Sequence, residues 1–238
     1  MINAILAVND LPFIWKNSTI EGKAIIILLG IFSTFAWSVM VAKTLQMRRA
    51  KKLNAFFDTE FRNQKHVLEV YDRRLTVEGC PLYTVYKDGC DQLDARLRTE
   101  ANEGRKKEVS LKVMEHVKRA LESAVAREAL KLESGLILLA IAVSGGPFLG
   151  LLGTVWGVMS AFSYVAMAVQ AGGRADLATM APGVACALLT TVAGLLVAIP
   201  SMFAYNWLVH SLRVFTVELD NFAQELVSKM ETEYLKDE

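Results

Sequence analysis

Three threonine hydroxyls and one thiol lie within long apolar runs, where few other side chains could do chemistry. They belong to Thr154, Thr190, Thr191 and Cys186. A hydroxyl in a helix can bond a backbone carbonyl of its own helix, or it can hold a water molecule. A hydroxyl between helices can also act as a hydrogen-bonding contact that holds them together. Taken alone, the residues favour this second, structural role.

Small residues accompany these hydroxyls at helical spacing. The first run carries Gly146, Gly150, Gly153 and Gly157, and the second carries Gly183, Ala187, Thr190, Thr191, Gly194 and Ala198. Residues three and four apart share one face of a helix, and small residues let two helix backbones approach closely in lipid. In water each helical glycine costs roughly 1 kcal/mol relative to alanine. The pattern therefore predicts packed membrane helices in an oligomer, and a tight crossing in a soluble protein is the alternative.

The composition lies between that of a soluble domain and that of a purely intramembrane protein. Of the 238 residues, 53% are hydrophobic and 21% are charged, and the mean hydropathy is +0.31. These values predict a few membrane spans together with a substantial aqueous portion. The net charge of +1 gives no reason to expect nucleic-acid binding.

The residue types and spacings do not match those of an enzyme or cofactor site. We find no nucleophile triad, no glycine-rich phosphate loop and no cluster of metal ligands. The cysteines Cys80, Cys90 and Cys186 have no metal-site spacing and make no even-numbered disulfide framework, and we interpret Cys80 and Cys90 as small packing residues. We therefore expect neither an enzyme nor a metal or other cofactor.

The first apolar run fixes an expected orientation. It occupies 22–43 and includes about 20 residues, the length that crosses a bilayer. Five of the ten residues in 43–52 are basic. Because basic residues stay on the cytoplasmic side, we expect the N-terminus outside and the C-terminus inside. The preceding segment, 1–21, is expected to be periplasmic, either as an amphipathic helix on the membrane surface or as a loosely ordered tail.

Two further apolar runs complete the predicted architecture. We divide the rest of the chain into a cytoplasmic helical region (44–133), a second span (134–170), a short periplasmic loop (171–176), a third span (177–209) and a cytoplasmic C-terminal helix (210–238). The second run would be near 50 Å long, so it should project beyond the membrane, join the preceding charged helix and kink at Pro147. The chain is thus predicted to be an all-α polytopic membrane protein with three transmembrane helices.

Two motifs carry a resemblance to a known family. Gly150-Leu-Leu-Gly-Thr-Val-Trp-Gly-Val-Met159 is the first, and the second is Ala181-Pro-Gly-Val-Ala-Cys-Ala-Leu-Leu-Thr-Thr-Val-Ala-Gly-Leu-Leu-Val-Ala-Ile-Pro200, followed by Tyr205-Asn206. They resemble the signature of the TolQ/ExbB/MotA proton-channel family, and the TolQ and ExbB branch more than MotA. Strong similarity covers 147–206, and segment lengths are compatible over the whole chain.

The resemblance implies a machine that converts a proton gradient into force. It implies a homopentamer whose second and third spans line a central pore that holds the single-span helices of a TolR/ExbD-like dimer. An aspartate of that partner would carry the proton, and a TonB- or TolA-like protein would pass the work to the outer membrane. Thr154 and Thr191 match the two pore threonines of the family's ion path, and we expect Thr190 to line the pore with them. From residue type and spacing, we assign helix packing and kinks to Pro147, Gly150, Gly153, Gly157, Pro182, Gly183 and Gly194.

One residue departs from the family pattern. The family usually has glutamate where this chain has Cys186, and Asp176 is the one acidic residue between Ser134 and Asn206. A thiol in an apolar helix is expected to stay neutral. Our hypothesis is that protonation takes place on the partner's aspartate, with Thr154 and Thr191 supplying hydroxyls and water. A non-conducting pentameric scaffold and a sodium-driven variant remain open as alternatives.

Overall fold

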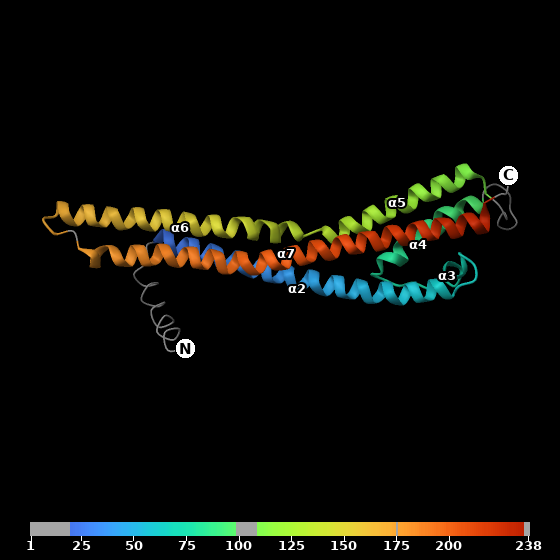
Figure 1. Ribbon diagram of the computed structural model, residues 1–238, viewed down its shortest axis with the longest axis horizontal. Coiled ribbons are helices and arrows are strands. Elements are labelled where there is room, and N and C mark those ends of the chain that lie inside the picture. Colours follow the sequence, from blue (N-terminus) through green and yellow to red (C-terminus); the bar gives the residue numbers. More distant parts are fainter. Residues whose placement is uncertain (1–19, 99–108, 175, 236–238) are drawn as a thin grey trace. The chain divides into compact units, whose positions relative to one another are not determined.

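The computed structural model describes residues 20–98, 109–174 and 176–235, and within them the regular structure is entirely helical. Figure 1 shows the helices α2 (Ile20–Asn63), α3 (Glu69–Asp72), α4 (Pro81–Leu97), α5 (Leu111–Glu133), α6 (Leu136–Gln170) and α7 (Leu177–Tyr234). The predicted amphipathic segment lies outside the described residues, apart from its last two positions. Three helices, α2, α6 and α7, are long and apolar enough to cross a membrane. The prediction of an all-α fold with three such helices is confirmed.

The chain divides into two compact units. We call the described residues of 20–41 and 135–206 the membrane unit, and those of 42–134 and 207–235 the helical domain. The helices α2 and α7 contribute residues to both units, because each continues well past the end of its apolar run. The third span and the C-terminal helix, which the sequence analysis separated at residue 209, are therefore parts of one helix.

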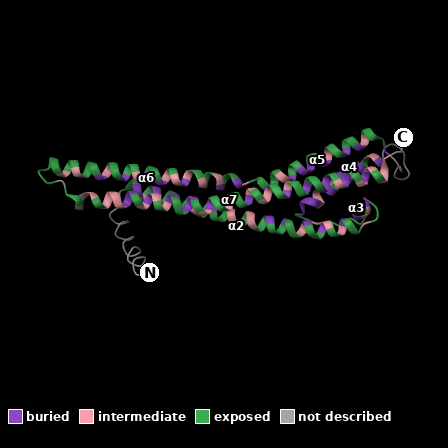
Figure 2. Ribbon diagram, viewed as in Figure 1, coloured by how far each residue is buried: buried purple, intermediate pink, exposed green. Residues whose placement is uncertain are grey.

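The membrane unit consists of α6 and the apolar parts of α2 and α7. Ile25 and Leu29 of α2 are buried with Val197 of α7, and Leu149 of α6 packs against this group. Much of the remaining apolar surface is exposed, as the green segments of these helices show in Figure 2. Exposed apolar surface of this extent is unfavourable in water, so it must face lipid or another protein chain.

The helical domain has its own apolar core. Phe57 and Phe61 of α2, Tyr86 of α4 and Phe222 of α7 form an aromatic group, with the Phe61 and Phe222 ring centroids 4.9 Å apart. Valines and leucines of α4, α5 and α7 surround it. Each fully buried side chain of this size contributes about 1.5–3 kcal/mol, so this core is a main source of the domain's stability.

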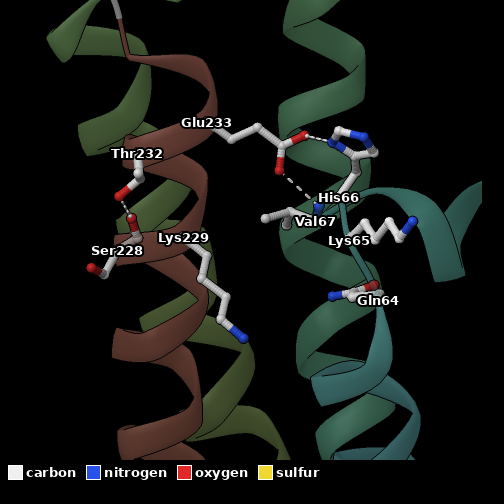
Figure 3. Close-up of a pocket in the computed structure, with 8 residues that line it drawn as sticks. All are labelled: Gln64, Lys65, His66, Val67, Ser228, Lys229, Thr232 and Glu233. Carbon is white, nitrogen blue, oxygen red and sulfur yellow. Dashed lines mark hydrogen bonds and ion pairs between the residues drawn. The ribbon is translucent and has the colours of Figure 1, made fainter.

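The connection between α2 and α4, a loop that contains the short helix α3, is fastened to this core by polar side chains. The hydroxyl of Tyr86 donates to the carbonyl of Val67 at 2.6 Å, and the hydroxyl of Tyr71 donates to Asp91 at 2.5 Å. Figure 3 shows Glu233 of α7 beside the start of this loop, where its carboxylate accepts from the Val67 amide at 2.8 Å and contacts His66 at 3.1 Å. The bonds at Val67 satisfy its backbone carbonyl and amide, and the other two contacts join side chains.

A short break separates α5 from α6, whereas the sequence analysis expected one continuous helix. The helix α5 ends at Glu133 and α6 begins at Leu136. Between them Gly135 has φ of 85°, in the left-handed region where glycine has no steric penalty. Lys43 of α2 donates to the Leu132 carbonyl at 3.3 Å, so a cation occupies the C-terminal end of α5.

Candidate functional site: the contact between α6 and α7

The glycines of α6 lie on the face that packs against α7. Gly146, Gly150, Gly153 and Gly157 are all buried. A Cβ atom placed on Gly153 would lie 2.3 Å from the hydroxyl oxygen of Thr190, and one on Gly157 would lie 2.8 Å from the Ala187 Cβ. No side chain fits at these distances, so glycine is required here for the two backbones to approach.

The small residues of α7 form the other half of this contact. A Cβ atom on Gly194 would lie 2.5 Å from the Gly146 carbonyl oxygen, and one on Gly183 would lie 2.8 Å from the Cβ of Ala161. A Cβ atom placed on Gly150 would lie 3.1 Å from the Thr190 carbonyl oxygen and 3.1 Å from the Thr191 Cα. The close approach therefore extends over several helical turns, from Gly146 to Ala161 on α6.

Thr190 lies inside this contact. Its side chain is fully buried, and its hydroxyl donates to the Ala187 carbonyl at 2.6 Å, with the Gly150 carbonyl 3.4 Å away. The hydroxyl is thus enclosed between two helices of the same chain. This geometry is that of a hydrogen bond between packed helices, and the expected place of Thr190 in the pore stays a prediction.

Thr191 and Thr154 are half-buried. The hydroxyl of Thr191 donates across the contact to the Gly150 carbonyl at 3.3 Å, whereas that of Thr154 donates to Leu151 of its own helix at 2.7 Å. The structure therefore brings Thr190 and Thr191 to one carbonyl of α6. Each hydroxyl oxygen keeps lone pairs that can accept from water. The predicted assignment of these threonines to an ion path stays a prediction.

Cys186 of α7 is a buried free thiol. A thiol is a weak donor and a weak acceptor, so its hydrogen bonds are weaker than those of the carboxylate that the family usually has here. Among the described residues, no group of three or more His, Cys, Asp or Glu side chains is arranged to hold a metal ion.

Ser201 is a hydroxyl residue of this helix that the sequence analysis missed. It is 2% exposed, and its hydroxyl donates to the Val197 carbonyl at 2.7 Å. Its position is seven residues after Gly194, which places both residues on nearly the same face of α7. This seven-residue spacing from Gly194 is a sequence signal that Ser201 shares the packed face of α7. The neighbouring Pro200, which can interrupt a helix, makes that signal harder to recognise.

The prolines lie inside the helices, as Pro147 does in α6 and Pro182 and Pro200 do in α7. A proline has no backbone N–H, so it leaves the carbonyl four residues earlier without its helical donor. For Pro147 that carbonyl belongs to Val143 and for Pro200 to Leu196. The kinks expected at Pro147 and Pro182 stay predictions.

The outer faces of α6 and α7 are apolar and uncovered. Phe148 and Val155 of α6 are 71% and 61% exposed, and Leu196 and Phe203 of α7 are 68% and 67% exposed. In a single copy of the chain, α6 and α7 therefore both keep exposed apolar surface on the faces that do not pack against each other.

Comparison with known proteins is consistent with this arrangement. The MotA/TolQ/ExbB proton channel family matches residues 90–221, more than half of the chain. The Tol-Pal system protein TolQ of Pseudomonas aeruginosa is 34% identical over 194 residues, which cover 80% of this chain and 79% of that protein. TolQ of Haemophilus influenzae is 33% identical over 92% of both chains. The biopolymer transport protein ExbB of Pseudomonas putida is 30% identical over 90% of this chain, which spans only 61% of the length of that protein. The chain belongs to the MotA/TolQ/ExbB proton channel family.

Proposed function

We propose that this protein is the stator and channel subunit of an ion-driven motor in the bacterial inner membrane, with the proton as the ion. The observation that carries the proposal is the close contact of α6 and α7, in which glycines pack against a helix that bears hydroxyls. The names of the similar proteins, which refer to the Tol-Pal system and to biopolymer transport, support work directed at the cell envelope. We assign no enzymatic activity, because this work requires no covalent chemistry.

The uncovered apolar faces support an assembly of several copies. In a homopentamer, α6 and α7 of each subunit would surround a central pore, and other apolar faces would contact lipid. The half-buried Thr154 and Thr191 would then be the hydroxyls available to water in that pore. Thr190 would remain inside the subunit, as a hydrogen bond between helices.

The proton would be carried by a second protein. The part of α6 and α7 within the membrane unit contains no Asp or Glu side chain, and a carboxylate is the group that usually binds a proton inside a membrane. We therefore assign titration to an aspartate of a single-span TolR/ExbD-like dimer in the pore. Force would pass from this complex to a TonB- or TolA-like protein. The N-terminus would be periplasmic and the C-terminus cytoplasmic.

The test is ion flux through the complex of this chain with its single-span partner in liposomes that contain a pH-sensitive dye. We expect a proton flux that follows the imposed gradient and is independent of sodium. Cys186→Ala should retain this flux, because the proposed path places the proton on the partner's aspartate. Replacement of the partner's aspartate by asparagine should abolish it.

Cys186 itself supports a second candidate, a pentameric scaffold that anchors the partner without conducting ions. A scaffold would assemble with the partner but give no flux above that of empty liposomes. Loss of flux in Cys186→Ala, with assembly intact, would contradict the proposed role of the partner's aspartate. Flux that requires sodium would instead identify a sodium-driven variant.

A further inference from the structure

Four basic side chains are exposed on α2 shortly after its apolar run ends. Arg48, Arg49, Lys51 and Lys52 form this group, which we call the basic face. Within the described residues none of the four makes an ion pair with a carboxylate. Elsewhere in the helical domain basic residues do have such partners, as Arg127 has in Asp88 at 2.7 Å.

The basic face points away from the core of the helical domain. On the same stretch of α2, Met47, Ala50, Asn54 and Phe57 are buried. At 100° per residue the four basic positions span an arc of about 160°, and the buried positions lie on the opposite side of the helix. The packing of the domain therefore leaves the basic face free for a partner outside this fold.

The four basic residues follow closely along α2 after its apolar run. The helix is continuous from Ile20 to Asn63, and its apolar run ends at Ala42. At 1.5 Å per residue, Arg48 follows the end of this run by about 9 Å and Lys52 by about 15 Å. In an α-helix the Cα–Cβ bonds tilt toward the N-terminus, which here is the membrane end. The polar headgroup zone adds about 5–8 Å beyond the hydrocarbon core, within reach of long basic side chains.

We propose that the basic face binds the phosphate groups of anionic phospholipids in the leaflet on this side of the membrane. Arginine offers a planar fork that matches a phosphate, and lysine adds a compact positive charge. Clusters of at least four Lys or Arg directly after a span are suited to anionic lipid, and each charge favours association by about fivefold. This proposal does not depend on whether the complex conducts ions.

The test is lipid selectivity of the full chain in phosphatidylcholine bilayers. Electron paramagnetic resonance measures the association of spin-labelled phosphatidylglycerol relative to spin-labelled phosphatidylcholine. We expect wild-type protein to prefer phosphatidylglycerol at least about fivefold, and we expect 1 M salt to remove most of this preference because charges are then screened beyond about 3 Å. R48Q/R49Q/K51Q/K52Q should bring the two lipids close to equal association.

A matched control removes four charges from elsewhere in the helical domain. K65Q/K87Q/K112Q/K118Q changes the net charge by the same amount at exposed positions away from the basic face, and it should retain the preference. The double variants R48Q/R49Q and K51Q/K52Q each keep two residues of the basic face together with Lys43, so they preserve the charge signal that orients the span. Each should lose part of the selectivity.

Three results would overturn the proposal. The first is equal association of the two lipids with wild-type protein at low salt, which would leave an acidic protein segment as the partner to consider. The second is full selectivity in both double variants. The third is an equal loss in the control, which would mean that net charge and not the basic face governs the preference.

Discussion

Gly153 and Gly145 occupy the same helix but have different surroundings. A Cβ atom on Gly153 would overlap the Thr190 side chain at 2.3 Å, whereas one on Gly145 would have nothing within 4 Å. We predict that Gly153→Ala lowers stability by about 1–3 kcal/mol, because the added methyl group separates α6 from α7. Gly145→Ala is the matched control and should leave stability unchanged or raise it by roughly 0.5–1 kcal/mol. Thermal unfolding in detergent, followed by circular dichroism, measures both, and equal effects would contradict the close contact.

The half-buried hydroxyls give a second prediction at the scale of single residues. Thr154→Val and Thr191→Val keep the shape of the side chain but remove the hydroxyl. If these hydroxyls hold water in the ion path, each variant should lower proton flux by about tenfold, equivalent to roughly 1.4 kcal/mol in the barrier. Ser163→Ala is the control, because this exposed hydroxyl bonds the Met159 carbonyl of its own helix at 3.0 Å. Wild-type flux in both threonine variants would exclude them from the path.

At the scale of elements, the loop between α2 and α4 should lose its hydrogen bond to α4 in alkaline solution. The hydrogen bond to the Asp91 carboxylate, together with burial, raises the pKa of Tyr71 to about 12. In the unfolded chain a tyrosine titrates near pH 10, so the unfolded state loses this proton first. The contribution of the Tyr71 hydroxyl to the free energy of unfolding is therefore complete below about pH 10. It declines as the pH rises toward 12. Burial raises the pKa of Tyr86 as well, which acts in the same direction.

Tyr71→Phe tests this attachment. It removes the hydroxyl that Asp91 accepts from, so it should lower stability at pH 8 by about 1 kcal/mol. It should also reduce the loss of stability between pH 10 and 12, which urea unfolding followed by tryptophan fluorescence can measure. An unchanged slope with pH in the variant would show that Tyr71 is not the titrating group.

The break between α5 and α6 depends on one backbone conformation. Gly135 has φ of 85°, and a residue with a Cβ atom loses about 1–2 kcal/mol in that region. We predict a loss of this size for Gly135→Ala and a smaller one for Gly135→Asn, since asparagine tolerates the left-handed conformation better. Thermal unfolding of the two variants provides the comparison. If alanine is tolerated as well as asparagine, the two helices can join without this conformation.

The elements differ in how far the sequence alone predicts them. The three spans are predicted from long runs without charge, and the two small-residue faces from glycine, alanine and threonine at spacings of three and four. Both signals are local properties of the sequence. The break at Gly135 does not, because the helical pattern continues on both sides of it. The role of Thr190 depends on which side of α7 meets α6, and that is decided by packing. The bond from Tyr71 to Asp91 joins positions 20 residues apart and has no periodic signal.

At the scale of the whole molecule, the question is what covers the exposed faces of α6 and α7. Side chains such as Phe148 and Leu196 are more than two thirds exposed in one chain. Lipid can cover such a surface, but lipid does not explain why the same helices also carry half-buried hydroxyls at Thr154 and Thr191. A ring of identical subunits covers part of the apolar surface and places these hydroxyls around a shared axis.

We predict a pentamer in mild detergent, because the family resemblance implies five copies and a ring covers part of the exposed faces of α6 and α7. Native mass spectrometry should give a protein mass of about 130 kDa, since closed rings of identical subunits have a fixed copy number and one chain has 26.3 kDa. Binding of the partner should increase the mass of the complex without changing the number of copies of this chain in it. Gly153→Ala should form fewer rings than Gly145→Ala, because the ring requires α6 and α7 to stay packed within each subunit. A purified protein that remains a single copy, with its lipid retained, would contradict both the pentamer and the pore that depends on it.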